Sequence, residues 1–275
     1  MYKLNPNIKK ILLEVIKYTS SGRGRKPTYD VEHYLDVIYY VLQSDIKWVA
    51  LKEKLHYDTY RKKFQYWCEQ LHVFECAYSI ICDLLDSNYY DHSKLKKLYM
   101  DSTDVLNKKG IECIGKSKKL KFKNATKINI IVDNNGIILA VKIYPANKND
   151  STITKDTIYS MSIKTISSRK FPKYLIGDKG YTSKDVKNRI KKKFKLVYPE
   201  KKNTVNSVYN SNQKILNKQL LSTRNVNENT FAWMKECKRL TSRYDRLLST
   251  FTGFVFLQVI KTIACKLDNM GIHIM

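Results

Sequence analysis

The first ninety residues alternate apolar and polar positions with the period of an α-helix. From Val31, apolar residues recur at offsets of 3, 4, 7, 10 and 11 positions, which places them on one helix face. Asp30 precedes this run where an N-cap residue is expected. Similar stripes predict further helices around Ile11, over 48–55, 60–71 and 74–86. A tight turn between the second and third helices favours a helix-turn-helix arrangement, although many small helical domains show the same pattern.

Beyond Lys97 the helical stripes give way to short β-rich runs. Residues 98–101, 127–132 and 137–144 are predicted strands, and the Asn-Gly pair before Ile137 predicts a hairpin between the last two. Further along, the pattern predicts alternating helices and strands, at 150–166, 173–176, from 183, 194–198, 224–248 and 251–267. The order βββ-α-β-α-β-α is that of an RNase H-like fold, an α/β architecture on a mixed sheet. We therefore predict a helical region over 1–95, with the DNA-binding role that a helix-turn-helix arrangement favours, and an RNase H-like catalytic domain over 96–275.

The charge of the chain narrows the class of partner. Its 275 residues carry 51 Lys and Arg against 25 Asp and Glu, a formal net charge of +26. Such an excess indicates a polyanionic partner, and nucleic acid is the principal candidate. A membrane surface is the competing polyanion, but no signal peptide or membrane-spanning segment is expected from the apolar runs. The six cysteines form no Cys-x-x-Cys pair, so we interpret them as reduced thiols without structural zinc.

Three carboxylates occupy the positions at which an RNase H-like enzyme carries its metal ligands. Asp101 lies in the first predicted strand, Asp178 follows the fourth, and Glu228 lies on a late helix. Two Mg²⁺ ions prefer such hard oxygen ligands, and together they can assist phosphodiester cleavage. On a helix, Arg224 and Lys235 share a face with Glu228. Taken alone, that face would be interpreted as a solvated row of ion pairs.

The combined motifs resemble a known family. From Arg23 to the end, the chain is similar to DDE transposases of the bacterial insertion-sequence type. The matching motifs are Gly24-Arg25-Lys26-Pro27, Tyr99-Met100-Asp101-Ser102-Thr103, Lys127 to Gly136, Asn147 with Asp150, Gly177-Asp178-Lys179-Gly180-Tyr181, and Arg224, Glu228 and Lys235 followed by Arg239-Leu240 and Arg243-Tyr244-Asp245-Arg246. Leu221 and Asn229 depart from the Tyr and Arg that the family often has at those places. The segment between Asp178 and Glu228 leaves no room for the large inserted domain of some relatives.

The resemblance implies roles for these residues. Asp101 would bridge two Mg²⁺ ions, for which Mn²⁺ substitutes, and Asp178 and Glu228 would each complete one site, without a nucleotide cofactor. We expect DNA contacts from Arg224, Lys235, Arg239, Arg243, Lys127, Arg23, Arg25, Arg61 and Lys62. Asp150 is interpreted as a helix cap, and residues 23–27 as a plain linker rather than a minor-groove arm. The lysines at 116, 118, 119, 121, 123 and 127 are expected to contact DNA, with a solvated basic loop as the alternative.

The sequence therefore predicts a Mg²⁺-dependent DNA transposase that cleaves the ends of a mobile element and joins the freed 3′-hydroxyl to target DNA. Its partners would be double-stranded DNA, both terminal inverted repeats and target, with a homodimer or higher oligomer assembled on it and no membrane. We expect it on the nucleoid of a bacterium, or in the nucleus if its host is a eukaryote or a eukaryotic virus. Two alternatives stay open: an RNase H-like nuclease without strand transfer, and a domesticated transposase retained as a DNA-binding protein.

Overall fold

A computed structural model describes residues 4–20, 29–90, 95–161, 174–181, 194–199 and 211–272. Several sequence predictions fall outside these ranges. They are the DNA contacts of Arg23 and Arg25, the helix opening near Ser183, and the part of the predicted helix 150–166 beyond residue 161.

The chain forms two compact units whose limits differ from the predicted division. The first, here called the helical unit, comprises 1–81, 105–114 and 233–275, and the second, the sheet unit, comprises 82–104 and 115–232. By its contacts the C-terminal part of the chain groups with the N-terminal helices, and the predicted division at residue 95 stays a prediction. That part returns to the N-terminal helices because its last helix is apolar on several sides and needs them to cover it.

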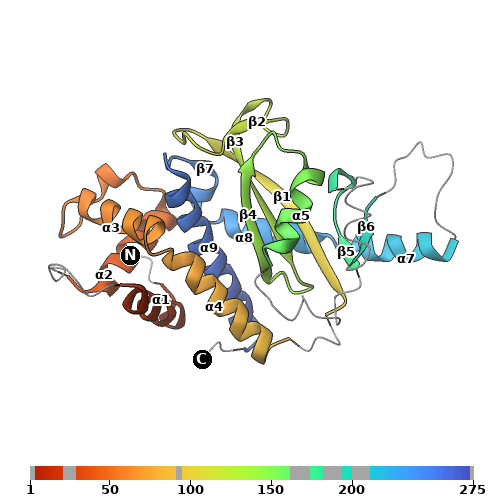
Figure 1. Ribbon diagram of the computed structural model, residues 1–275, viewed down its shortest axis with the longest axis horizontal. Helices are drawn as coiled ribbons and strands as arrows, with labels where there is room; N and C mark the ends of the chain where they lie inside the picture. The colour runs from red at the N-terminus through yellow and green to blue at the C-terminus, as the bar shows by residue number, and fades with distance from the viewer. Residues whose placement is uncertain are drawn as a thin grey trace. The chain divides into compact units, whose positions relative to one another are not determined.

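The helical unit is built around this last helix, α9 (Leu248–Asn269), which contacts α1 (Pro6–Thr19), α2 (Val31–Ser44) and α3 (Tyr57–Glu69) (Figure 1). Its other elements are η1 (Trp48–Ala50), the start of α4 (Val73–Asn88), η4 (Lys238–Leu240) and β7 (Ser242–Arg243). Gly253 allows α9 to pack closely against α3, since a Cβ there would lie 2.3 Å from Cys68 Sγ and 3.2 Å from Phe64, both in α3. The rings of Phe64 and Phe254 lie 4.3 Å apart in the core below.

Helix α9 is long and apolar enough to cross a membrane by length and composition. However, 61% of its most apolar window is buried inside the protein, and it carries buried polar side chains such as Gln258, which accepts a hydrogen bond from Gln43. These features are typical of a core helix.

The sheet unit carries the mixed sheet. Its elements are most of β1 (Lys97–Asn107), whose last three residues belong to the helical unit, β2 (Gly115–Ser117), β3 (Lys123–Val132), β4 (Ile138–Pro145), α5 (Asp150–Tyr159), β5 (Tyr174–Ile176), η3 (Lys179–Tyr181), β6 (Lys195–Val197), α7 (Ser211–Ser222) and most of α8 (Asn225–Lys235). The strands lie in the order β2-β3-β1-β5-β6, and β4 also pairs with β3. The β3–β4 pair is antiparallel, whereas β5 is parallel to both β1 and β6. This is the predicted α/β fold on a mixed sheet, with α5 packed against β3 and β4 (Figure 1).

One predicted helix is much shorter than expected. The pattern predicts a helix from Arg224 to about Leu248, but α8 ends at Lys235 and is followed by the η4 turn and strand β7. The apolar positions Cys237 and Leu240 are buried as predicted, although from a turn rather than from a helix face. The last residues of β1 explain the change, because they pair in parallel with β7 and draw the chain into an extended conformation.

Candidate active site

Asp101 lies in β1, and Asp178 lies two residues beyond the end of β5, the parallel strand beside it. Tyr99 of β1 pairs with Ile176 of β5, and each aspartate follows two residues after its member of this pair. Residues two apart along a strand point to the same face, and neighbouring strands lie about 4.8 Å apart. The chain after β5 stays beside β1, since a Cβ on Gly177 would be 3.5 Å from the Met100 carbonyl oxygen. The register therefore brings the two predicted carboxylates together.

The surroundings of Asp101 combine burial with nearby positive charge. Burial raises the pKa of the Asp101 carboxyl, while the backbone N–H of Ser102 and the charges of Lys119 and Arg224 act in the opposite direction. The Ser102 N–H donates to Asp101 Oδ1 at 2.7 Å. Asp178 is more exposed, with 49% of its side chain accessible, and its Oδ1 lies 3.8 Å from an Arg224 guanidinium nitrogen. Arg224 thus lies beside both carboxylates.

Glu228 is the third predicted carboxylate, and it is exposed in the first turn of α8. Arg224 lies in the turn immediately before α8, four residues ahead of Glu228 in the sequence. Among the residues that the structure describes, no group of three or more His, Cys, Asp or Glu side chains lies close enough to hold a metal ion. Asp101 and Asp178 are thus placed together by the strand register, and Glu228 lies four residues beyond the arginine that contacts Asp178.

A network of polar side chains lies below the two aspartates. The hydroxyl of Tyr181, in η3, donates to Asn129 Oδ1 at 2.9 Å, and the Asn129 amide donates to Thr157 Oγ1 at 2.8 Å. All three side chains are buried. Burial raises the pKa of Tyr181 well above its usual range, and the charges of Asp150 and Asp101 raise it further. The network joins η3, β3 and α5, and so fixes the loop that carries Asp178.

Asp150 belongs to this cluster and does not cap α5. The N-cap position is Asn149, and Asp150 directs its carboxylate toward β1 and β3 instead. Its Oδ1 accepts from Ser102 Oγ at 3.3 Å and from the ammonium of Lys127 at 2.7 Å. Gly180 lies close to this carboxylate, since a Cβ there would be 3.1 Å from Asp150 Oδ2. The helix-cap interpretation is therefore wrong, and Asp150 holds β1, β3 and α5 together beside the site.

Lys127 was predicted to contact DNA, and the structure gives it a different place. Its side chain is 7% exposed, and its ammonium donates to Asp150 and, at 2.7 Å, to the carbonyl oxygen of Lys148. A buried ammonium with two internal acceptors does not face a phosphate. The predicted contact is therefore not supported, and Lys127 stabilises Asp150.

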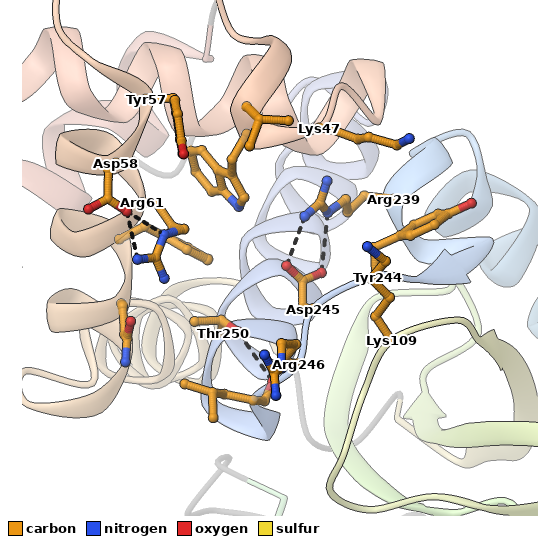
Figure 2. A pocket seen from close by; sticks show the side chains of 15 residues that line it. Lys47, Tyr57, Asp58, Arg61, Lys109, Arg239, Tyr244, Asp245, Arg246 and Thr250 are labelled. Carbon is orange, nitrogen blue, oxygen red and sulfur yellow. Dashed lines mark hydrogen bonds and ion pairs between the residues drawn. The ribbon is translucent and has the colours of Figure 1, made fainter.

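Two predicted DNA-binding arginines are also buried. Arg239 is 3% exposed and pairs through two nitrogens with the carboxylate of Asp245, at 3.2 and 2.9 Å (Figure 2). Arg243 is fully buried and donates to the carbonyl oxygens of Glu112, Asp245 and Arg246. Both guanidinium groups also lie over phenylalanine rings of α9. They hold the segment 243–246 in shape, so their predicted contact with DNA is wrong in this structure.

The Arg239–Asp245 pair forms part of a pocket of about 440 Å³ in the helical unit. In Figure 2, Lys47, Lys109 and Arg246 surround it, and Arg61 pairs with Asp58 on the opposite wall. Lys62, one residue on, pairs with the same aspartate at 3.0 Å. Lys47, Lys62, Lys109, Arg246 and, at the end of α8, Lys235 are exposed. The predicted DNA contacts of Arg61, Lys62, Arg224 and Lys235 thus concern side chains that reach the surface, and they stay predictions.

Sequence reasoning missed several residues of the site. Asn129 and Thr157 stand in runs that indicate only a strand and a helix, and nothing in them marks a hydrogen-bond network. Tyr181 was visible as the last residue of the Gly177 to Tyr181 motif, but its inward direction comes from the η3 turn. Lys119, whose ammonium donates to the Ser102 carbonyl oxygen at 3.1 Å, could be seen only as one lysine among many.

Comparison with known proteins places the chain in a family. The family model described as a transposase DDE domain matches residues 92–260, more than half of the chain. No curated protein matches the sequence. Among solved structures, the chain is similar to a piggyBac transposase synaptic complex with hairpin DNA, at 8% identity over 100% of this chain and 69% of that one, with a TM-score of 0.47. It is also similar to a pre-cleavage Mos1 transpososome, at 10% identity over 90% and 82% of the two chains, with a TM-score of 0.27.

The family match covers Asp101, Asp178 and Glu228, the residues predicted from the sequence, and it includes the whole central sheet. The chain therefore belongs to the transposase DDE domain family and is a DNA transposase.

Proposed function

We propose that this transposase cleaves the DNA at the ends of a mobile element with two Mg²⁺ ions held by Asp101, Asp178 and Glu228. The observation that carries the proposal is the parallel pairing of β1 with β5, in which Tyr99 lies opposite Ile176, because Asp101 and Asp178 follow these two residues at the same spacing. Carboxylate oxygens suit Mg²⁺ and Mn²⁺. Asp101 in particular has a partly buried carboxylate whose pKa burial raises, and a bound cation would offset that desolvation.

When bound, the ions would activate the attacking oxygen and stabilise the leaving oxygen of the phosphodiester. The chain's own residues would do the rest. Arg224, beside both aspartates, would hold a non-bridging oxygen of the scissile phosphate, and Lys235 a phosphate further along. The network from Tyr181 to Thr157 would keep the Asp178 loop in position, so that little reorganisation accompanies the reaction.

The proposed reaction has two steps. Water first attacks the phosphodiester at the element's end, which forms one P–O bond, breaks another and frees a 3′-hydroxyl. That hydroxyl then attacks a target phosphodiester, with the same exchange of P–O bonds and no nucleotide cofactor. Holding two ends and a target requires more than one chain, and we propose a homodimer or larger assembly on DNA. In a bacterial host it would work at the nucleoid.

Three conservative variants test this function. Asp101→Asn, Asp178→Asn and Glu228→Gln should each reduce cleavage of labelled element-end DNA in Mg²⁺ to background, while DNA binding persists. Asp156→Asn, an exposed carboxylate of α5, is the matched control and should cleave normally. Full cleavage by any of the three variants would contradict the metal-site assignment.

A strand-transfer assay separates the remaining alternatives. A transposase joins labelled element ends to a target plasmid, whereas a nuclease of the same fold releases cut ends that are never joined. A domesticated DNA-binding protein would bind the ends and do neither. In all three cases binding should weaken linearly on a log–log plot against salt, because lysines and arginines displace counterions from the DNA.

A further inference from the structure

The turn between β2 and β3 holds a phenylalanine in an unusual backbone conformation. Lys121 and Phe122 have φ angles of 52° and 60°, in the left-handed region. Residues with a Cβ rarely adopt this region, and a bulky aromatic side chain there is a clear outlier. The turn is nevertheless well fixed: the N–H of Phe122 donates to the Ser117 carbonyl oxygen at 2.7 Å, and that of Leu120 to Ser117 Oγ at 3.1 Å. Strained residues of this kind cluster at functional sites.

The strained conformation exposes the ring within a strongly basic surface. Phe122 is 65% exposed, although burial would favour an apolar ring of this size. Five exposed lysines lie within eight residues around it: Lys116, Lys118, Lys119, Lys121 and Lys123. The sequence holds no acidic residue between Glu112 and Asp133. An apolar ring surrounded by cations fits a partner that offers both phosphates and stacked aromatic bases, which is DNA.

The position of the turn links it to the candidate active site. The Lys119 ammonium donates to the carbonyl oxygen of Ser102, the residue after Asp101. Ser117 at the base of the turn also donates to Asp104, three residues beyond Asp101 on β1. Both contacts lie within the sheet unit and tie the turn to the strand that carries the first carboxylate.

We propose that Phe122 is a wedge that inserts into the base stack of duplex DNA beside the bond to be cut, while the surrounding lysines bind the flanking phosphates. Architectural DNA-binding proteins use apolar side chains in this way, and the insertion unstacks a base step and kinks the helix. Unstacking a base beside the scissile bond would let the DNA backbone bend into the candidate active site, which lies between the neighbouring strands β1 and β5. The location of the wedge rests on the proposed function, because it assumes that Asp101 marks the place of cleavage.

Base unstacking can be measured without cleavage. The probe is a duplex with the element's terminal inverted repeat and 2-aminopurine at successive positions around the cut, bound to the Asp101→Asn protein. Fluorescence of 2-aminopurine rises when the base leaves the stack. We expect a rise at one step beside the cut, its loss when Phe122→Ala is added, and its retention with Phe122→Trp. Binding should weaken about tenfold with Phe122→Ala, within the range that loss of one stacking contact gives.

Two further variants distinguish the effect of the Phe122 ring from the effect of the left-handed turn conformation. Phe122→Gly tolerates the φ of 60° and should fold at least as stably, yet lose the fluorescence rise. Lys121→Gly removes one charge at the neighbouring left-handed position and should keep the rise. An undiminished rise with both Phe122→Ala and Phe122→Gly would overturn the wedge. Cleavage of DNA by the Asp101→Asn protein would instead contradict the proposed function. The failure of the wedge and the failure of the proposed function are therefore distinguishable.

Discussion

Replacing Lys127 by methionine distinguishes a structural lysine from a DNA-binding one. Methionine keeps the apolar stem of the side chain and removes the ammonium that joins Asp150 to the Lys148 carbonyl oxygen. The sequence motif suggested a phosphate contact at this position, whereas the structure encloses the ammonium within the sheet unit. The two roles predict opposite results in stability and in DNA binding.

The expected loss of stability follows from the burial of the pair. Removing one partner of a fully buried ion pair costs about 3–5 kcal/mol, because the other charge stays buried. Lys127 is 7% exposed and Asp150 is 22% exposed, so water can replace part of the lost interaction. We therefore expect Lys127→Met to lower the free energy of unfolding by about 2 kcal/mol, and the Tm by about 4–8 °C for a chain of this size.

Thermal melts and salt titrations of DNA binding together form the assay. A lysine that binds one phosphate contributes about 0.9 to the slope of log K against log salt. Lys127→Met should leave the slope unchanged. The exposed lysine Lys123 is the matched control: Lys123→Met should change stability by less than about 0.5 kcal/mol and lower the slope by about 0.9. In a double-mutant cycle, Lys127→Met and Asp150→Asn together should cost less than the sum of the two separate losses.

A stable Lys127→Met protein with a reduced salt slope would refute this reasoning. Such a result would mean that the lysine leaves Asp150 and reaches a phosphate when DNA binds. Additive losses in the double-mutant cycle would likewise contradict the pairing, since they would show that each side chain acts on its own.

Three further predictions concern other parts of the protein. Arg239→Met should destabilise the helical unit by about 3 kcal/mol in urea unfolding, because it leaves the buried carboxylate of Asp245 without its two hydrogen bonds, and a loss below about 1 kcal/mol would contradict a structural role. Burial raises the pKa of the Cys237 thiol to about 12, so this thiol ionises in unfolded chains before it ionises in folded ones as pH rises above 9. The wild type should therefore lose stability relative to Cys237→Ala by up to about 1.4 kcal/mol per pH unit above pH 9. Parallel plots of unfolding free energy against pH for the two proteins would show that the thiol is not perturbed. Phe122→Gly should raise the free energy of unfolding by about 1 kcal/mol in thermal melts by removing left-handed strain, and a lower Tm would show that the ring packs against the protein.

The regular elements of the fold were largely predictable because their patterns are local. The apolar stripe from Val31 to Leu42 corresponds to α2, and the Asn-Gly hairpin joins β3 to β4 with Gly136 at a φ of 75°. Asp30 also stands at the N-cap of α2 as predicted, although its side chain makes no capping hydrogen bond. Periodicity and turn chemistry act over a few residues, and those few residues are visible in the sequence.

The remaining features depend on contacts between distant residues. Lys127 and Asp150 stand 23 positions apart, and their pairing requires the β3–α5 packing that no local pattern specifies. The predicted helix beyond Lys235 failed for a similar reason: the segment pairs with the end of β1, more than 130 positions earlier. Arg239 and Arg243 look like surface cations in sequence, and their burial follows from Asp245 and from carbonyl groups that the tertiary fold brings to them.

The return of α9 to the N-terminal helices has a consequence for the order of synthesis. A ribosome releases α1, α2 and α3 first, but the helix that covers Phe64 and Cys68 emerges only after the whole sheet unit. Until then the apolar faces of the early helices stay open to water, to chaperones and to proteases. Premature termination before Leu248 would therefore yield a fragment without a complete helical core.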